Sequence, residues 1–278
     1  MPELPEVERG RRLTEAVAAG RVIERVRCER DPIVFDGTSP ARFRRALEGN
    51  RVVASRRRGT QLWFEMARPP HPLFHYGMSG AFHTPDSDAV QLMSGPRVGD
   101  PAWPPRYLKI RLWLDDGGEL AMTDARRLGR ILLRDDPARE PPISRLGFDP
   151  LLDLPAPDEF ADRLRARGAV VKSLLLDQSF AAGVGNWIAD EVLYQARVDP
   201  RRRASSLTSA EARRVRTAMK RIVEKAVAVN ADNDRYPRSW LFHRRWGKNA
   251  DARTARGERI VHETIGGRTT AWVPERQR

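Results

Sequence analysis

The chain has 278 residues, which is enough for one large domain or two ordinary ones and too many for a mini-protein held by disulfides. Hydrophobic residues make up 40% of it, so a normal core can form and wholesale disorder is excluded. Fifty Lys and Arg against 37 Asp and Glu give a net charge of +13, which is typical of a protein with a polyanionic partner such as nucleic acid. Cys28 is the only cysteine, which excludes an internal disulfide and any zinc site built from cysteines.

The beginning of the chain is acidic and contains Pro2 and Pro5, unlike a secretory signal or an Arg-rich transit peptide. No run approaches the roughly 18 apolar residues of a membrane span. We therefore expect a soluble, intracellular protein without a membrane partner.

The first half of the chain predicts a helix followed by strands. Pro5 suits the first turn of a helix and Gly20 suits its end. Residues 107–114 alternate, with Leu and Ile on one face and Lys109 among the residues on the other, as in a half-buried strand. Further strands are expected at 61–66, 74–83 and 119–123, with a turn at 115–118 and a long surface loop at 84–105.

The second half of the chain predicts helices. Apolar residues recur at helical spacing in the longest segment, 209–229. Beyond Pro237 the pattern becomes short and strand-like, and Gly266-Gly267 is a turn candidate. The tail 235–278 holds 11 Lys and Arg against 4 Asp and Glu, a net charge of +7. Shorter helices are expected at 157–167, 172–177 and 187–196.

These elements predict an α+β protein in which an N-terminal helix and an antiparallel β-sandwich or barrel precede a helical domain with a basic hairpin. The expected divisions are an N-terminal domain at 1–141, a linker at 142–156, a helical domain at 157–234 and the hairpin at 235–278.

The amino terminus carries a candidate nucleophile. Removal of Met1 is normal before a residue as small as Pro2 and would leave a free secondary amine. An α-amine titrates near pH ~8, so part of it is nucleophilic at neutral pH, and its attack on an aldehyde-like carbon forms a cationic iminium. Glu3 and Glu6 could then supply an acid and a base. Spacing alone favours the other interpretation, a Pro- and Glu-rich helix start.

Three further features suit nucleic acid, each with a structural alternative. The glycines of 183–186, GVGN, would let the backbone approach a phosphate, with Asn186 as a cap or a contact, although such strings are common in turns. Short arginine clusters could line a groove or form a solvated surface. Met78 in a glycine-flanked bend could wedge between bases or pack in the core.

Together, these motifs resemble the formamidopyrimidine-DNA glycosylase (Fpg/Nei) family. The resemblance rests on MPELPEVE at 1–8, HYGMSG at 75–80, TDARR at 123–127, GVGN at 183–186 and GRTTA at 267–271, which occur in the family's order across nearly the whole chain. The segment 186–197, NWIADEVLYQAR, is most similar to the plant-type branch, which also lacks the zinc-finger cysteines.

The resemblance implies roles for single residues. Pro2 would attack the sugar C1′ of an everted damaged nucleotide, Glu3 would assist ring opening, and Glu6 would be a second acidic residue of the site. The expected phosphate contacts are Lys172, Asn186 and Arg268, and Met78 and Arg126 would fill the gap left by the flipped base.

The resemblance also implies a helix-two-turn-helix domain and a zincless hairpin held by packing, with no metal or organic cofactor. The expected partner is damaged double-stranded DNA, bound by a monomer that is located with the DNA, in the cytoplasm or nucleoid if the source is bacterial.

Two positions depart from the family pattern. Thr60 occupies the place of a lysine that contacts phosphate and assists base removal, so a compensating charge would have to come from Arg57 or Arg58. Leu128 occupies the third gap-filling position, usually Phe, and cannot stack as a ring does.

The favoured function is therefore a bifunctional DNA glycosylase and abasic-site lyase that removes oxidised bases such as 8-oxoguanine, formamidopyrimidines or oxidised pyrimidines. Thr60 supports an alternative, a non-catalytic or lyase-only protein that binds lesions or abasic DNA. A general RNA-binding protein would share the charge but would not explain Pro2, Glu3 and Arg268 together.

Overall fold

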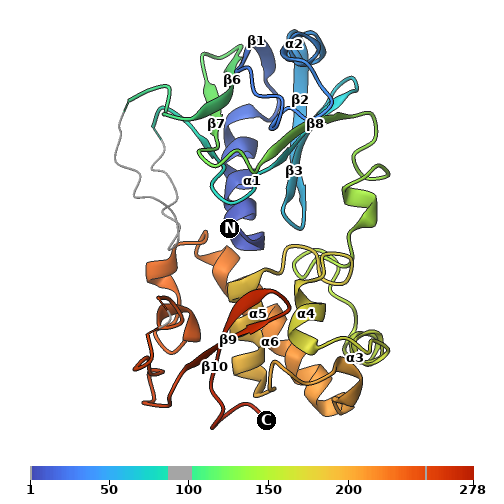
Figure 1. Cartoon of the computed structure of the whole chain (residues 1–278). Coiled ribbons are helices and arrows are strands. Elements are labelled where there is room, and N and C mark those ends of the chain that lie inside the picture. The colour runs from blue at the N-terminus through green and yellow to red at the C-terminus, as the bar shows by residue number, and fades with distance from the viewer. Residues whose placement is uncertain (1, 87–101, 248) are drawn as a thin grey trace. The chain divides into compact units, whose positions relative to one another are not determined.

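The computed structural model describes residues 2–86, 102–247 and 249–278 (Figure 1). The chain divides into two compact units, Met1–Arg145 and Leu146–Arg278, and the division falls inside the predicted linker 142–156. The mixed helices and antiparallel strands confirm the predicted α+β class.

Helix α1, Leu4–Ala18, opens the first unit as predicted from Pro5 and Gly20. Pro5 lies in its first turn, where the missing N–H costs nothing. Gly20 follows the helix with φ +82°, a conformation that favours glycine. Leu4 and Val7 are buried, so one face of the helix packs into the core.

Among the described residues of this unit, eight strands form one antiparallel sheet in the order β5-β7-β6-β1-β2-β3-β4-β8. The junction between β1 and β2 pairs only two residues of each strand, so the sheet consists of two four-stranded halves. The strands are β1 Val22–Cys28, β2 Asn50–Arg58, β3 Gln61–Met66, β4 His71–His75, β5 Ala81–His83, β6 Leu108–Leu114, β7 Glu119–Thr123 and β8 Arg130–Arg134, with helix α2 Pro40–Leu47 before β2 and a 3-10 turn η1 at Ile143–Arg145.

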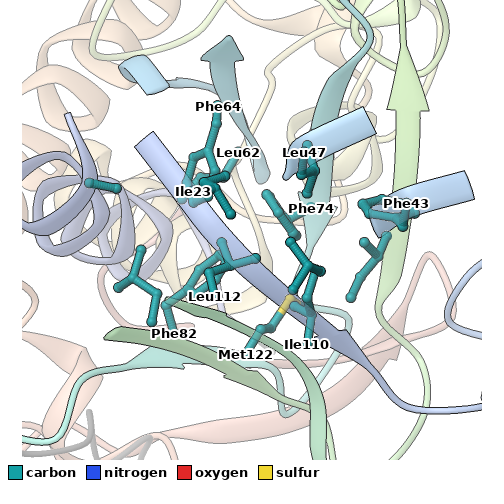
Figure 2. Packing of buried hydrophobic residues seen from close by; sticks show 14 of the residues in the cluster. Ile23, Phe43, Leu47, Leu62, Phe64, Phe74, Phe82, Ile110, Leu112 and Met122 are labelled. Carbon is teal, nitrogen blue, oxygen red and sulfur yellow. The ribbon is translucent and has the colours of Figure 1, made fainter. Parts of the chain in front are cut away.

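The core of this unit lies between the two halves of the sheet (Figure 2). Phe64 and Phe74 of one half meet Phe82 of the other, with ring centroids 5.0 to 5.7 Å apart. Ile110 and Leu112 of β6 are fully buried in the same cluster, as the alternation of 107–114 predicts. The core thus has the layering of a β-sandwich.

In its described part, the second unit consists of helices and one hairpin. Its longest helix begins with a capping box in which Thr208 Oγ1 accepts from Glu211 N–H at 3.2 Å and Glu211 Oε2 accepts from Thr208 N–H at 2.7 Å. The elements are α3 Pro157–Arg165, α4 Val171–Leu176, α5 Asn186–Ala196, η2 Ala204–Ser206, α6 Ser209–Ala228, η3 Asn233–Arg235, η4 Leu241–His243, β9 Val261–Ile265 and β10 Arg268–Trp272.

The structure differs from two sequence expectations and leaves a third untested. The predicted strand 74–83 is broken after His75 by a tight turn in which Gly80 N–H donates to Tyr76 C=O at 2.7 Å. Lys109 is buried rather than solvent-facing, because the register of β6 shifts between Leu108 and Ile110 and its ammonium pairs with Asp31 at 2.9 Å. Most of the predicted 84–105 loop, residues 87–101, lies outside the described residues.

Candidate active site

The proposed nucleophile lies at the positive end of α1. Pro2 is buried directly before the helix, and Glu3 is its N-cap residue. The Glu3 backbone N–H donates to Glu6 Oε2 at 3.0 Å, so the Glu6 carboxylate folds back over the helix start. The first turn of α1 therefore brings Pro2 and both candidate carboxylates into one small region of the molecule.

A buried ion pair ties α1 to the hairpin that carries Thr60. Glu8 Oε2 accepts from Arg57 Nε at 3.0 Å, and Arg57 Nη1 donates to Gly59 C=O at 2.9 Å. Burial raises the pKa of Glu8, but hydrogen bonds and charge from Arg11 and Arg57 outweigh burial and lower it overall. The Arg57 guanidinium is therefore buried in its contacts with Glu8 and Gly59.

Thr60 lies in the two-residue turn between β2 and β3 and contacts a histidine. Its Oγ1 is 3.2 Å from His75 Nε2, and His75 Nδ1 accepts from Gly77 N–H at 3.2 Å. Burial, followed by the charge of Arg130, lowers the pKa of His75. The hydroxyl of Thr60, where the sequence predicts a departure from a family lysine, is therefore hydrogen-bonded to a neutral imidazole.

The loops that carry the predicted gap-filling residues are joined by one buried carboxylate. Asp124 Oδ1 accepts from Ser79 Oγ at 2.7 Å and from Arg126 N–H at 3.2 Å, while Oδ2 accepts from Gly129 N–H at 2.7 Å. A Cβ on Gly77, whose φ is +58°, would lie 2.4 Å from the Gly129 nitrogen, so only glycine fits this approach. The backbones beside Met78 and Arg126 are thus fixed to each other.

The side chains on these loops are the accessible part of this arrangement. Met78 is half-buried, whereas Arg126 and Leu128 are exposed, Leu128 by 46%. Between them, Arg127 is held to Asp31 by two hydrogen bonds of 3.0 Å. Exposed side chains on a fixed backbone suit insertion into a base stack.

The phosphate-contact candidates of the second unit are placed around α5 and the hairpin. Gly185, not Asn186, is the N-cap residue of α5, and Asn186 Nδ2 donates to Thr269 C=O at 2.8 Å. Arg268 is exposed at the start of β10. Lys172 is fully buried and its ammonium pairs with Asp190. Its contact with phosphate stays a prediction.

The described residues contain no group of three or more His, Cys, Asp or Glu side chains that could hold a metal ion. Among these residues, no helix is both long and apolar enough to cross a membrane.

Comparison with known proteins identifies the family. Residues 1–131 match the model of the formamidopyrimidine-DNA glycosylase N-terminal domain, and residues 146–236 match that of its H2TH domain. The chain belongs to the formamidopyrimidine-DNA glycosylase family. This confirms the resemblance inferred from the motifs, and membership supports a glycosylase of base excision repair that acts on DNA.

Individual relatives cover the chain from end to end. The formamidopyrimidine-DNA glycosylase of Arabidopsis thaliana is 43% identical over all 278 residues and 71% of its own length. That of Thermus thermophilus is 32% identical over 99% of this chain and 97% of the relative. The structure of MutM in complex with DNA containing carbocyclic 8-oxo-G aligns with a TM-score of 0.81 and 24% sequence identity over all of both chains. The structure of the Lactococcus lactis glycosylase bound to AP-site DNA aligns with a TM-score of 0.80 and 24% sequence identity over 99% of each chain. These two solved structures establish the fold.

Sequence reasoning missed the residues that hold the site together. His75 and Asp124 lie inside the quoted motifs, yet their roles depend on contacts with residues 15 and 45 positions away, Thr60 and Ser79. The only available signal was a polar side chain within a glycine-rich or arginine-rich motif.

Proposed function

We propose that this protein removes oxidised bases from double-stranded DNA with the Pro2 amine as nucleophile and then cleaves the strand at the resulting abasic site. The Pro2 nitrogen forms a bond to C1′ while the bond from C1′ to the base breaks, and the base leaves with its electron pair and takes up a proton. Glu3 protonates the ring oxygen O4′, the ring opens, and the amine becomes an iminium on C1′.

The iminium is the electron sink for two eliminations. Loss of a proton from C2′ expels the 3′ phosphate, and loss of a proton from C4′ then expels the 5′ phosphate, so neither step needs an oxidant or reductant. Hydrolysis of the iminium by water returns the free amine. Glu6 is proposed as the second acidic residue of these proton transfers.

The position of Pro2 is the observation that supports this mechanism. Pro2 lies directly before α1, beside the buried Glu3 and the carboxylate of Glu6. An ordinary helix start would need a cap but no secondary amine. Because the chain belongs to a DNA glycosylase family, we interpret the Pro2 amine as the nucleophile of the reaction.

Damaged double-stranded DNA is the proposed partner of a monomer, without a metal or organic cofactor. Met78, Arg126 and Leu128 would fill the gap left by the everted base. Lys172, Asn186 and Arg268 would hold the phosphates. Solved neighbours bound to AP-site and 8-oxo-G DNA support this choice, as does the net charge of +13.

The Thr60–His75 hydrogen bond favours one alternative, a lyase that cleaves existing abasic sites but excises bases poorly. A neutral hydroxyl cannot supply the positive charge of the lysine that the resemblance implies at this position. Elimination depends chiefly on the amine and Glu3, so cleavage at an abasic site would remain.

Borohydride trapping on two duplexes separates these possibilities. Reduction converts the iminium into a stable protein–DNA adduct, and Met1 removal is first confirmed by mass. Adducts on both the abasic and the 8-oxoguanine duplex would support the full reaction. An adduct on the abasic duplex alone would support the lyase, or another lesion as substrate, and no adduct on either would refute the Pro2 mechanism and leave a lesion-binding protein.

A further inference from the structure

A single buried carboxylate joins four separate segments of the second unit. Asp190 of α5 has a fully buried side chain. Its Oδ1 pairs with Lys172 of α4, and its Oδ2 accepts from Arg245 Nε at 3.1 Å and from the backbone N–H of Ala271 at 3.1 Å. These partners lie in α4, in the segment after η4, and in β10.

The contact with Ala271 belongs to a row that runs along α5. Asn186, Asp190 and Tyr194 are spaced by four residues and so lie on one face of the helix. Asn186 donates to Thr269 C=O at 2.8 Å and Tyr194 Oη donates to Glu258 at 3.3 Å. The hairpin therefore follows this face of α5 (Figure 1).

The turn of the hairpin is seated on α4. A Cβ on Gly266 would lie 2.4 Å from Ser173 Oγ, so backbone and side chain are in close contact there. Ser173 follows Lys172, whose ammonium reaches Asp190. The turn before β10 therefore contacts α4, and Ala271 near the other end of β10 contacts α5. Arg268 lies between the turn and Ala271.

We propose that Asp190 is a positioning residue that fixes β10 and thereby places Arg268 for contact with phosphate, a task that a metal ion performs in hairpins built on cysteines. The inference rests on the proposed role of Arg268. Apolar packing by Ile260, Ala271 and Val273 also holds the hairpin. Packing alone is non-directional, whereas a carboxylate with several directed donors sets the position of the strand along the helix.

The test is a double-mutant cycle on affinity for a duplex with a tetrahydrofuran site, which cannot form an iminium. The variants are Asp190→Asn, Arg268→Ala and their combination. We expect each single change to weaken binding by roughly 10-fold, within the range for charge-assisted hydrogen bonds, and the double variant to bind like Arg268→Ala. The inference would be overturned if the double variant lost affinity by the product of the two single losses, or if Asp190→Asn kept full affinity.

Asp149→Asn is the matched control. Asp149 is a fully buried aspartate of the same unit whose carboxylate accepts the backbone N–H groups of Leu151 and Leu152. We expect full affinity from it, and an equal loss would show that any buried aspartate has this effect. Hydrogen exchange of the Ala271 amide should quicken in Asp190→Asn and not in Asp149→Asn, and unchanged protection would also overturn the inference.

If Asp190→Asn does not fold, Arg245→Gln tests the same inference. This variant removes one charged partner of Asp190 but leaves Lys172 as its counterion. Arg245→Gln should weaken DNA binding alone but should not weaken it further when added to Arg268→Ala. A further loss in the double variant would count against the inference. Full affinity in Arg268→Ala would refute the phosphate contact and this inference together. The Pro2 mechanism would be unaffected, since trapping tests it separately.

Discussion

At the scale of single residues, Thr60 is a position where the sequence predicts a departure from the family pattern. Its hydroxyl is hydrogen-bonded to His75, and the nearby Arg57 is buried against Glu8. We therefore propose that the positive charge that would assist base removal is reduced at this turn.

Restoring that charge should raise base excision. We expect Thr60→Lys to increase the single-turnover rate of base release from an 8-oxoguanine duplex by about tenfold, equivalent to ~1.4 kcal/mol of transition-state stabilisation. Cleavage of a preformed abasic site should change less. Thr217→Lys, which adds the same charge on the exposed face of α6, is the control. An unchanged excision rate in Thr60→Lys would show that this position does not limit the reaction.

Asp31 makes a pH-dependent contribution to stability. Burial raises the pKa of Asp31, but hydrogen bonds from Arg127 and Lys109 outweigh burial and hold the pKa well below its ordinary value of 3.8. Stability from a lowered carboxylate pKa is present above the unfolded-state pKa and is lost as pH falls towards the folded-state value.

We therefore expect Asp31→Asn to lower the free energy of unfolding at pH 7 by at least about 1 kcal/mol, because the buried Lys109 ammonium loses its charged partner, whereas solvent screens the half-exposed Arg127. Urea titrations should show the two proteins converging as the pH falls below ~4. A constant difference down to low pH would show that the Asp31 charge does not cause the effect.

At the scale of elements, the loops after β4 and β7 act as one unit because both bind Asp124. Asp124→Ala would leave the buried Gly129 N–H without its acceptor, at a cost of about 1–3 kcal/mol. The loops that carry Met78 and Leu128 should then lose their fixed position.

The expected result for Asp124→Ala is base excision from duplex DNA reduced by at least tenfold, with much less effect on a single-stranded abasic site, where no gap must be filled. Asp115→Ala, in the exposed turn after β6, is the matched control. Equal losses on both substrates would contradict a role in filling the gap.

The elements differ in how far the sequence predicts them. Helix α1, the alternating β6 and the hairpin at Gly266-Gly267 carry local signals, and the structure contains all three. Lys109 faces inward because Asp31, 78 positions away, supplies its partner. Local periodicity contains no information on such a contact.

The candidate site shows the same limit. Pro2 and Glu3 could be named from the sequence because they occur in one motif at the start of the chain. The roles of Asp124 and Asp190 could not be predicted from the sequence, because each carboxylate accepts hydrogen bonds from donors in distant segments.

At the scale of the whole molecule, the net charge of +13 predicts strongly salt-dependent DNA binding. Arg268→Ala should lower the slope of log affinity against log salt by roughly 0.9, the value for one lost phosphate contact. Arg139→Ala removes an exposed arginine that pairs with Asp136 and should leave the slope unchanged. An unaltered slope in Arg268→Ala would show that this arginine does not contact phosphate.

The proposed reaction requires that the covalent bond to DNA forms at one atom, the Pro2 nitrogen. Borohydride-trapped adduct on an abasic duplex can be digested with trypsin and located by mass spectrometry. We predict that the sugar remnant lies on the peptide Pro2–Arg9, that Pro2→Gln, which retains Met1, gives no adduct, and that Pro5→Ala still gives one. A remnant on a lysine-containing peptide, or an adduct that persists in Pro2→Gln, would contradict the mechanism.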